Sequence, residues 1–156
     1  MKVVTFNIRC DYGQDGLNEF ANRKELILRK INQEKPDIIG FQEVLPHVAK
    51  WLKENLNEYY VIGCGRGANL RDEQMSIAYH RDRINLISMK TWWLSQTPDV
   101  PGSRYEEQSS CPRTATEAVF EDIKNDKVFR FINTHLDHIG AQAREKGLTQ
   151  IINQLN

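Results

Sequence analysis

The chain has 156 residues, of which 40% are hydrophobic and 27% charged, so it is long enough for one globular domain with a hydrophobic core. Basic and acidic residues both number 21, and this zero formal net charge argues against a protein that binds nucleic acid through a wide basic surface. No apolar stretch reaches the length of a membrane span, and a strand-like run from Val3 leaves no room for a signal peptide.

The N-terminal third predicts alternating strands and helices. Residues 3–8 form a β-prone run. From Leu17 to Ile31, apolar residues recur with helical spacing, and Pro36 predicts that this helix ends just before it. The run 38–42 predicts a fully buried strand, and Pro46 suits the first position of a second helix. This β-α-β-α order favours a parallel strand pair with a crossover helix.

The rest of the chain predicts short strands, one long loop and a last helix. The expected strands are 59–62, 76–79, 84–88, 116–121 and 128–133, with a hairpin turn at Lys124–Asn125–Asp126 between the last two. Residues 95–112 predict a long loop of the kind that is often functional. Apolar residues at helical spacing, the last of them Leu155, predict the final helix. With no repeat or linker, we expect a single domain over residues 1–156.

The cysteines indicate a reducing compartment. Cys10, Cys64 and Cys111 are odd in number and lack the spacing of a metal site, so we expect free thiols. Together with the lack of a membrane span, this predicts a soluble, cytoplasmic chain.

Two polar residues follow the first two predicted strands. Asn7 ends the first strand and Glu43 follows the second. The carboxyl ends of parallel strands meet at one edge of a sheet, where α/β folds place ligands. Magnesium prefers oxygen ligands, keeps several waters and often uses one or two carboxylates. Glu43 is therefore a candidate metal ligand, although it could equally cap the helix at Pro46 or face solvent.

A histidine-rich segment ends a later strand. His135 and Asp137 lie on one face of an extended segment, and a histidine there can contact phosphate or stabilise a transition state. His135, Asp137 and His138 also allow a zinc site, but the further histidine usual in such sites is replaced by Asn133. For His138 a structural role is the preferred interpretation.

Two other residue types point to phosphate and substrate. Arg113 ends the long loop, and its planar guanidinium suits bidentate phosphate binding, although a lone surface arginine is commoner. Of Trp92 and Trp93, one could wall a substrate pocket, and at least one is expected in the core.

The order of these motifs resembles the endonuclease/exonuclease/phosphatase family. The similar segments are Val4–Asn7, Ile38–Val44, Ser76–Tyr79, Trp93–Pro98, Pro112–Arg113, Phe131–His138 and Ala143–Arg144. The resemblance implies a deoxyribonuclease-I-like four-layer α/β sandwich. It also implies a phosphoester hydrolase that uses Mg²⁺, with Mn²⁺ as a substitute. In this resemblance Glu43 binds the metal, Asn7 helps to position it, and Arg113 and His135 contact phosphate or stabilise the transition state.

The sequence departs from the family pattern in three places. Gly-Asp-Phe-Asn and Ser-Asp-His, which the resemblance places after the last helix, are missing. We therefore expect a fold incomplete at its C-terminus and a chain that is nearly inactive alone. An uncovered apolar sheet face would then favour self-association. Residues 105–108 also replace a Trp-Asp pair of many small bacterial members, in a loop that the resemblance places near the substrate.

The sequence leaves the substrate and one rival function open. The resemblance allows nucleic acid, a nucleotide, a sugar phosphate or a lipid head group as the phosphoester, and zero net charge mildly disfavours a nonspecific DNA-degrading enzyme. The rival is an inactive protein of the same fold that acts as a binding module. Metal binding at Glu43 favours the hydrolase.

Overall fold

The first sheet contains the parallel pair that the sequence predicts. In the computed structural model, which describes residues 1–155, β1 (Val3–Asn7) pairs in parallel with β2 (Ile38–Gln42). β4 (Ile77–His80) lies antiparallel between β2 and β3 (Tyr59–Ile62), giving the order β1-β2-β4-β3. All five residues of β2 are buried, as predicted from its apolar run.

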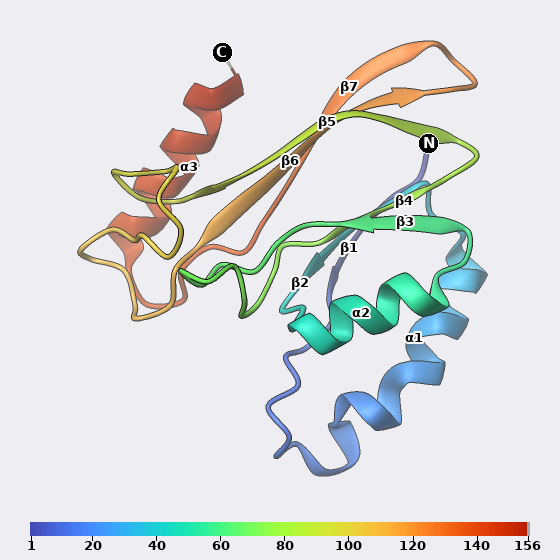
Figure 1. Cartoon of the computed structure of the whole chain (residues 1–156), viewed down its shortest axis with the longest axis horizontal. Helices are drawn as coiled ribbons and strands as arrows, with labels where there is room; N and C mark the ends of the chain where they lie inside the picture. Colours follow the sequence, from blue (N-terminus) through green and yellow to red (C-terminus); the bar gives the residue numbers. More distant parts are fainter. Residues whose placement is uncertain (156) are drawn as a thin grey trace.

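Two helices cover the outer face of this sheet (Figure 1). α1 (Phe20–Glu34) begins later than predicted, because Gly16–Asn18 forms the short 3₁₀ turn η1 instead. It ends where Pro36 predicts, with Lys35 left-handed at a φ of 44° and its N–H bonded to the Ile31 carbonyl. α2 (Pro46–Asn55) begins at its proline. The apolar residues between these helices and the sheet include Phe20, Ile27, Ile31, Ile39, Phe41, Val48 and Leu52.

The second sheet is an antiparallel meander. β5 (Ile84–Trp93), β6 (Thr114–Asp122) and β7 (Lys127–Thr134) lie in the order β5-β6-β7, and the predicted hairpin turn joins the last two. β5 is longer than predicted and includes Trp92 and Trp93, which are 0% and 4% exposed. Both tryptophans therefore belong to the core, and the Nε1–H of Trp93 donates to the Arg66 carbonyl at 2.6 Å.

The two sheets pack face to face, so the expected uncovered apolar face is covered in its central part. Ile38, Ile77 and Tyr79 of the first sheet pack against Ile84, Ala118 and Phe120 of the second. The chain supplies strands to both sheets, so their inner faces cover each other at these residues. The inner face of β1 is not covered, because Val3, which pairs with Ile38, is 47% exposed.

A polar bridge also crosses between the sheets. The Asn133 amide donates to the Phe41 and Ser76 carbonyls at 2.7 and 2.9 Å and accepts from Gln42 at 2.7 Å. Gly40 allows this close approach, since a Cβ there would lie 3.0 Å from the Asn133 oxygen. This bridge holds the ends of β2 and β7 together.

The fourth layer is α3 (Ala141–Leu155), which packs on one end of the second sheet. Trp92, Ala115, Tyr105, Ala143 and Ile151 form the apolar contact, and the long loop between β5 and β6 lies beside it. Within residues 1–155, no helix is long and apolar enough to cross a membrane.

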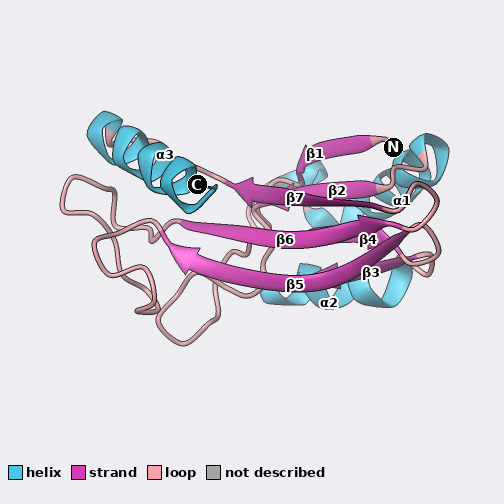
Figure 2. Ribbon diagram, turned by 90° about the horizontal axis from the view of Figure 1, so that it is seen from above, coloured by secondary structure: helices cyan, strands magenta, loops and turns pink. Residues whose placement is uncertain are grey.

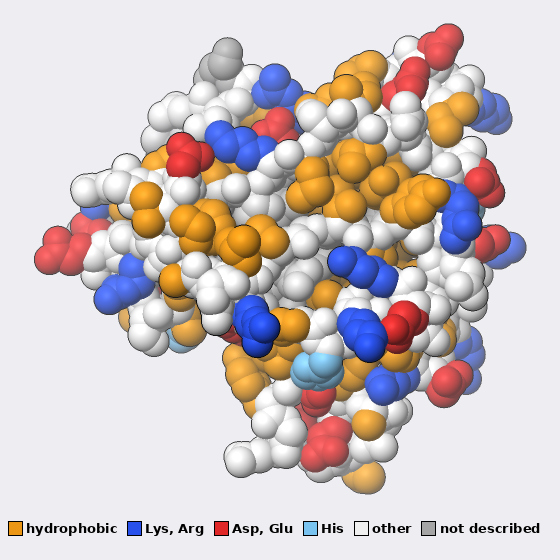
Figure 3. All heavy atoms as spheres, viewed as in Figure 1, with side chains coloured by type: hydrophobic (Ala, Val, Ile, Leu, Met, Phe, Trp, Pro, Cys, Tyr) orange, Lys and Arg blue, Asp and Glu red, His pale blue; other side chains and the backbone are white. Residues whose placement is uncertain are grey.

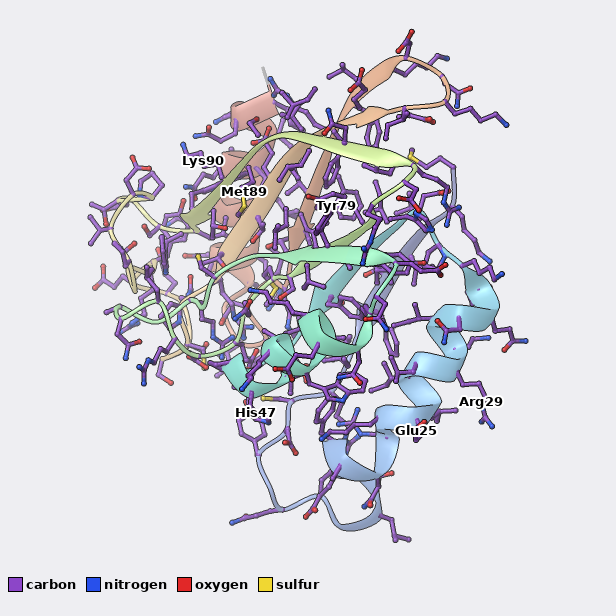
Figure 4. All side chains as sticks on the ribbon, turned by 45° about the vertical axis from the view of Figure 1, so that its right-hand side comes forward. Glu25, Arg29, His47, Tyr79, Met89 and Lys90 are labelled. Carbon is purple, nitrogen blue, oxygen red and sulfur yellow. The ribbon has the colours of Figure 1, made fainter. Side chains whose placement is uncertain are left out.

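The strand edges lie on two flanks. Figure 2 shows β1 and β7 along one flank and β3 and β5 along the other. On the second flank, apolar side chains gather between the two strands in Figure 3, and Figure 4 shows Tyr79 in that gap. A shallow hollow there is lined by Tyr60, Tyr79, Ile84, Leu86 and Ile123, with polar neighbours.

Candidate functional site

Glu43 is held in an unusual backbone conformation at the end of β2. Its φ of 63° is rare for a residue with a side chain and is a form of strain that clusters at functional sites. The Asn7 amide donates to Oε1 and the Cys10 backbone N–H donates to Oε2, both at 2.7 Å. Asn7 Oδ1 accepts the Arg9 N–H at 2.9 Å, so both ends of this amide are engaged. Asn7 thus fixes the direction of the Glu43 carboxylate, as expected from the two adjacent parallel strands.

The Glu43 carboxylate is ionised in this setting. Burial favours its neutral form, but the hydrogen bonds from Asn7 and Cys10 outweigh burial and leave its pKa below the usual value. The positive charge of the nearby Arg113 acts in the same direction. A negative charge therefore persists beside the two groups that the sequence assigns to phosphate.

Arg113 is buried and held in place from the segment that follows β7. Its side chain is 6% exposed and its Nε lies 3.3 Å from Asp137 Oδ1, while Nη2 lies 2.8 Å from His138 Nδ1. Arginine can only donate, so His138 accepts at Nδ1 and carries its proton on Nε2. The guanidinium is thus oriented by two neighbours of His135, which agrees with the structural role predicted for His138.

Asp137 is the anchor of this arrangement. Its carboxylate accepts from Ser109 Oγ at 2.5 Å and from the Ser109, Ile139 and Gly140 backbone N–H groups at 3.1, 3.1 and 2.8 Å. Burial opposes ionisation, but these donors outweigh it and hold the Asp137 pKa well below its usual range. Asp137 therefore links the long loop to the start of α3. Both of its carboxylate oxygens already accept hydrogen bonds, so it is not a candidate metal ligand.

His135 is a neutral imidazole inside the site. Burial lowers its pKa, and the nearby Arg113 lowers it further, so the ring is uncharged near neutral pH. Its Nδ1 is buried and has no hydrogen-bond partner among residues 1–155. An unsatisfied buried nitrogen is costly, and a bound water, an ion or a catalytic role is the usual explanation.

These side chains share one cavity of about 250 Å³. Its lining residues are Tyr12, Glu43, Arg66, Glu73, Cys111, Arg113, His135 and His138. The structure therefore brings Glu43, Arg113 and His135 together in one cavity. Asn7 does not line the cavity but donates a hydrogen bond to the Glu43 carboxylate. Sequence reasoning did not find Tyr12, Arg66, Glu73 or Cys111. Arg66 and Glu73 lie in a polar, glycine-containing turn that has the composition of a solvated loop, and only folding buries them.

The donor set fits magnesium better than zinc. Among residues 1–155, no three His, Cys, Asp or Glu side chains converge to hold a metal, so the alternative of His135, Asp137 and His138 does not form a zinc site. Magnesium needs fewer protein ligands, because it keeps much of its water shell. Glu43, ionised and directed into the cavity, fits the role of a single carboxylate ligand.

A larger hollow lies elsewhere and contains none of the predicted site residues. It measures about 700 Å³ and is lined by α3 side chains together with Ser95, Pro98 and Tyr105. Tyr105 donates from its hydroxyl to Gln150 at 3.0 Å, and Glu107 pairs with Lys146. Residues 105–107 thus line hollows beside α3 and not the cavity of Glu43.

Comparisons with known proteins agree with this architecture. The sequence model of the endonuclease/exonuclease/phosphatase family matches residues 4–108. A family protein from Bacteroides vulgatus shares 37% identity at a TM-score of 0.93, over 96% of this chain and 57% of its own. A mannosyl-6-phosphatase from Bacteroides thetaiotaomicron shares 30% identity at a TM-score of 0.93, over 99% and 58%. The predicted sandwich fold is thereby confirmed.

A curated relative likewise matches most of this chain but only about half of its own length. The uncharacterized protein L388 of Acanthamoeba polyphaga mimivirus is 29% identical over 145 residues, which are 88% of this chain and 54% of that protein. The chain thus spans somewhat more than half the length of the proteins it matches.

Proposed function

Because this chain belongs to the endonuclease/exonuclease/phosphatase family, we propose that it forms part of a metal-dependent phosphoester hydrolase. The observation that carries this proposal is the single cavity lined by Glu43, Arg113 and His135. An ionised carboxylate, a buried guanidinium and a neutral imidazole meet there, which is the set of groups that binds a phosphoryl group beside a cation.

Each residue has a distinct role in this proposal. Glu43 binds a divalent metal, Mg²⁺ or in its place Mn²⁺, and Asn7 holds the carboxylate in the required direction. When bound, such a metal neutralises phosphoryl charge and lowers the pKa of coordinated water. Arg113 uses Nε and Nη2 for Asp137 and His138, so Nη1 remains to donate to a phosphoryl oxygen. His135 hydrogen-bonds the same group as a neutral ring and adds no competing charge.

The substrate is proposed to be a small phosphomonoester, and a sugar phosphate is the first candidate. The similar mannosyl-6-phosphatase supports this choice over a nucleic acid, a nucleotide or a lipid head group. The zero formal net charge also favours it over a nucleic acid, because proteins that bind nucleic acid through a wide surface carry an excess of Lys and Arg. We place the protein in the cytoplasm, on the basis of its free thiols.

The test is phosphate release from mannose 6-phosphate and p-nitrophenol release from the diester bis-p-nitrophenyl phosphate, each with Mg²⁺ or Mn²⁺, together with calorimetric Mg²⁺ titration. Glu43→Gln is the test variant, and Glu25→Gln, on the exposed side of α1 in Figure 4, is the matched control. We expect Mg²⁺ binding that Glu43→Gln abolishes and Glu25→Gln leaves intact.

The turnover result separates the two functions that the sequence leaves open. Because Gly-Asp-Phe-Asn and Ser-Asp-His are missing, we expect very slow turnover by this chain alone. Turnover that depends on Glu43 would confirm the hydrolase and refute the need for those motifs. If the chain shows no metal binding and no turnover, the hydrolase proposal is overturned and the binding module is favoured.

A further inference from the structure

A second pair of charged side chains is buried in the wall of the same cavity. Arg66 and Glu73, in the turn between β3 and β4, are each only 4% exposed. Arg66 Nη2 donates to Glu73 Oε1 at 3.0 Å, and Nε lies 3.3 Å from Asp72 Oδ2. A buried ion pair contributes little to stability, because desolvation offsets its Coulomb attraction. Its presence beside Glu43 and His135 therefore calls for a functional reason.

The turn is shaped to hold this pair in position. The Arg66 N–H donates to the Glu73 carbonyl at 3.0 Å, and the Arg66 carbonyl accepts from buried Trp93 at 2.6 Å. Gly65 and Gly67 flank Arg66, and a Cβ at these glycines would come within 2.4 and 2.8 Å of the Arg71 backbone. Only glycine fits at both positions, so the turn is built to aim Arg66 and Glu73 at the cavity.

The Arg66–Glu73 pair has a donor, Arg66 Nη1, and an acceptor, Glu73 Oε2, that its own hydrogen bond does not use. Glu73 Oε1 accepts from both Arg66 Nη2 and Tyr12, so neither of these bonds uses Arg66 Nη1 or Glu73 Oε2. The Cys10 thiol also lies beside the Glu73 carboxylate. A hydroxyl group both donates and accepts, so it satisfies such a pair. A second phosphate would not, because Glu73 and Asp72 already neutralise Arg66 and would repel it.

Tyr12 lies between the Arg66–Glu73 pair and solvent. It lies in the loop after β1, is 73% exposed, and its hydroxyl donates to Glu73 Oε1 at 2.9 Å. The space behind it, about 250 Å³, is below the roughly 300–1,000 Å³ typical of pockets for drug-sized ligands. Its volume suits a compact group such as one small ring.

We propose that Arg66 and Glu73 bind ring hydroxyls of a phosphomonoester whose phosphoryl group lies on Arg113 and His135, and so select sugar phosphates over other phosphomonoesters. This inference rests on the proposed function, and it adds the residues that read the non-phosphate part of the substrate. Arg66 and Glu73 are positioned by the turn before substrate arrives, so little ordering is required on binding.

The test compares two ligands with the same phosphate and different hydroxyl content. Binding of mannose 6-phosphate and of n-hexyl phosphate to the chain, with Mg²⁺, is measured by calorimetry for the unmodified protein, Glu73→Gln and Tyr12→Phe. Glu25→Gln is again the control. We expect the unmodified protein and the control to prefer the sugar phosphate. Glu73→Gln removes a charged acceptor and should lower that preference about 10-fold or more, and Tyr12→Phe should lower it less.

The outcomes distinguish failure of this inference from failure of the proposed function. Equal affinity for the two ligands in the unmodified protein would overturn the selection of hydroxyls and leave phosphate binding in place. The same holds if Glu73→Gln weakens both ligands equally while circular dichroism shows an intact fold. No affinity for either ligand would overturn the proposed function itself, and this inference with it.

Discussion

At the residue scale, phosphate binding in the cavity depends on the orientation of the Arg113 guanidinium. A guanidinium with Nε toward Asp137 and Nη2 toward His138 can keep both contacts while Nη1 faces the cavity. A lysine at this position has one charged nitrogen and no fork, so it cannot do all three. We expect Arg113→Lys to weaken orthophosphate binding about 10–100-fold, the value of a charge-assisted hydrogen bond. The control is Arg29→Lys on exposed α1 (Figure 4), and equal effects of the two variants in calorimetry would contradict this role.

A second residue-scale prediction is that Asp137 makes the stability of the fold depend on pH. Its pKa in the fold lies below the ordinary 3.8, so its hydrogen bonds stabilise the protein fully above that value. As the pH falls below 3.8 and through the folded pKa, the carboxylate is protonated and this contribution is lost. Thermal melts of the unmodified protein and Asp137→Asn should therefore differ most near neutral pH and converge in acid. A gap that stays constant with pH would refute this assignment.

At the element scale, β2 and β7 are joined through Gly40 and the Asn133 bridge. A Cβ at residue 40 would lie 3.0 Å from the Asn133 oxygen and 3.2 Å from the Phe131 ring, and both groups are fixed by packing. Gly40→Ala should therefore cost about 1–3 kcal/mol, the usual range for overpacking a core. Urea unfolding measures this difference, and an unchanged midpoint would show that the sheets can move apart at no cost.

Elements could be predicted from the sequence where local patterns decide, and less well where packing decides. The apolar run of β2 predicted that strand, and the prolines predicted the end of α1 and the start of α2. The adjacent parallel strands placed Asn7 beside Glu43. The length of β5 was underestimated, because Trp92 and Trp93 became strand residues through pairing with β6.

The candidate site shows the same division between local and long-range information. Glu43, Arg113 and His135 could be named from motif order, and the structure places them in one cavity. Arg66 and Glu73 could not, because a charged, glycine-containing turn has the composition of a surface loop. In the fold, Arg66 and Glu73 form hydrogen bonds with Trp93 and Tyr12, which are distant in sequence.

At the scale of the whole molecule, the flank of β1 and β7 is open. Within residues 1–155, each of these strands pairs on one side only, and Val3 and Val128 are 47% and 63% exposed. Unpaired edge strands favour association with another chain. We expect concentration-dependent self-association in sedimentation velocity, reduced by Val128→Lys. Leu17→Lys, at an exposed residue outside the strands, is the control, and a monomer at all concentrations would contradict this expectation.

In the proposed function, a phosphoester binds in the cavity of Glu43, Arg113 and His135. The most direct measurement is a ¹H–¹⁵N NMR titration of the chain with orthophosphate in the presence of Mg²⁺. We predict shifts at Glu43, Arg113 and His135 and at the Arg66–Glu73 turn, all of which Glu43→Gln weakens. Shifts confined to the larger hollow beside α3, or no shifts at all, would contradict the central claim.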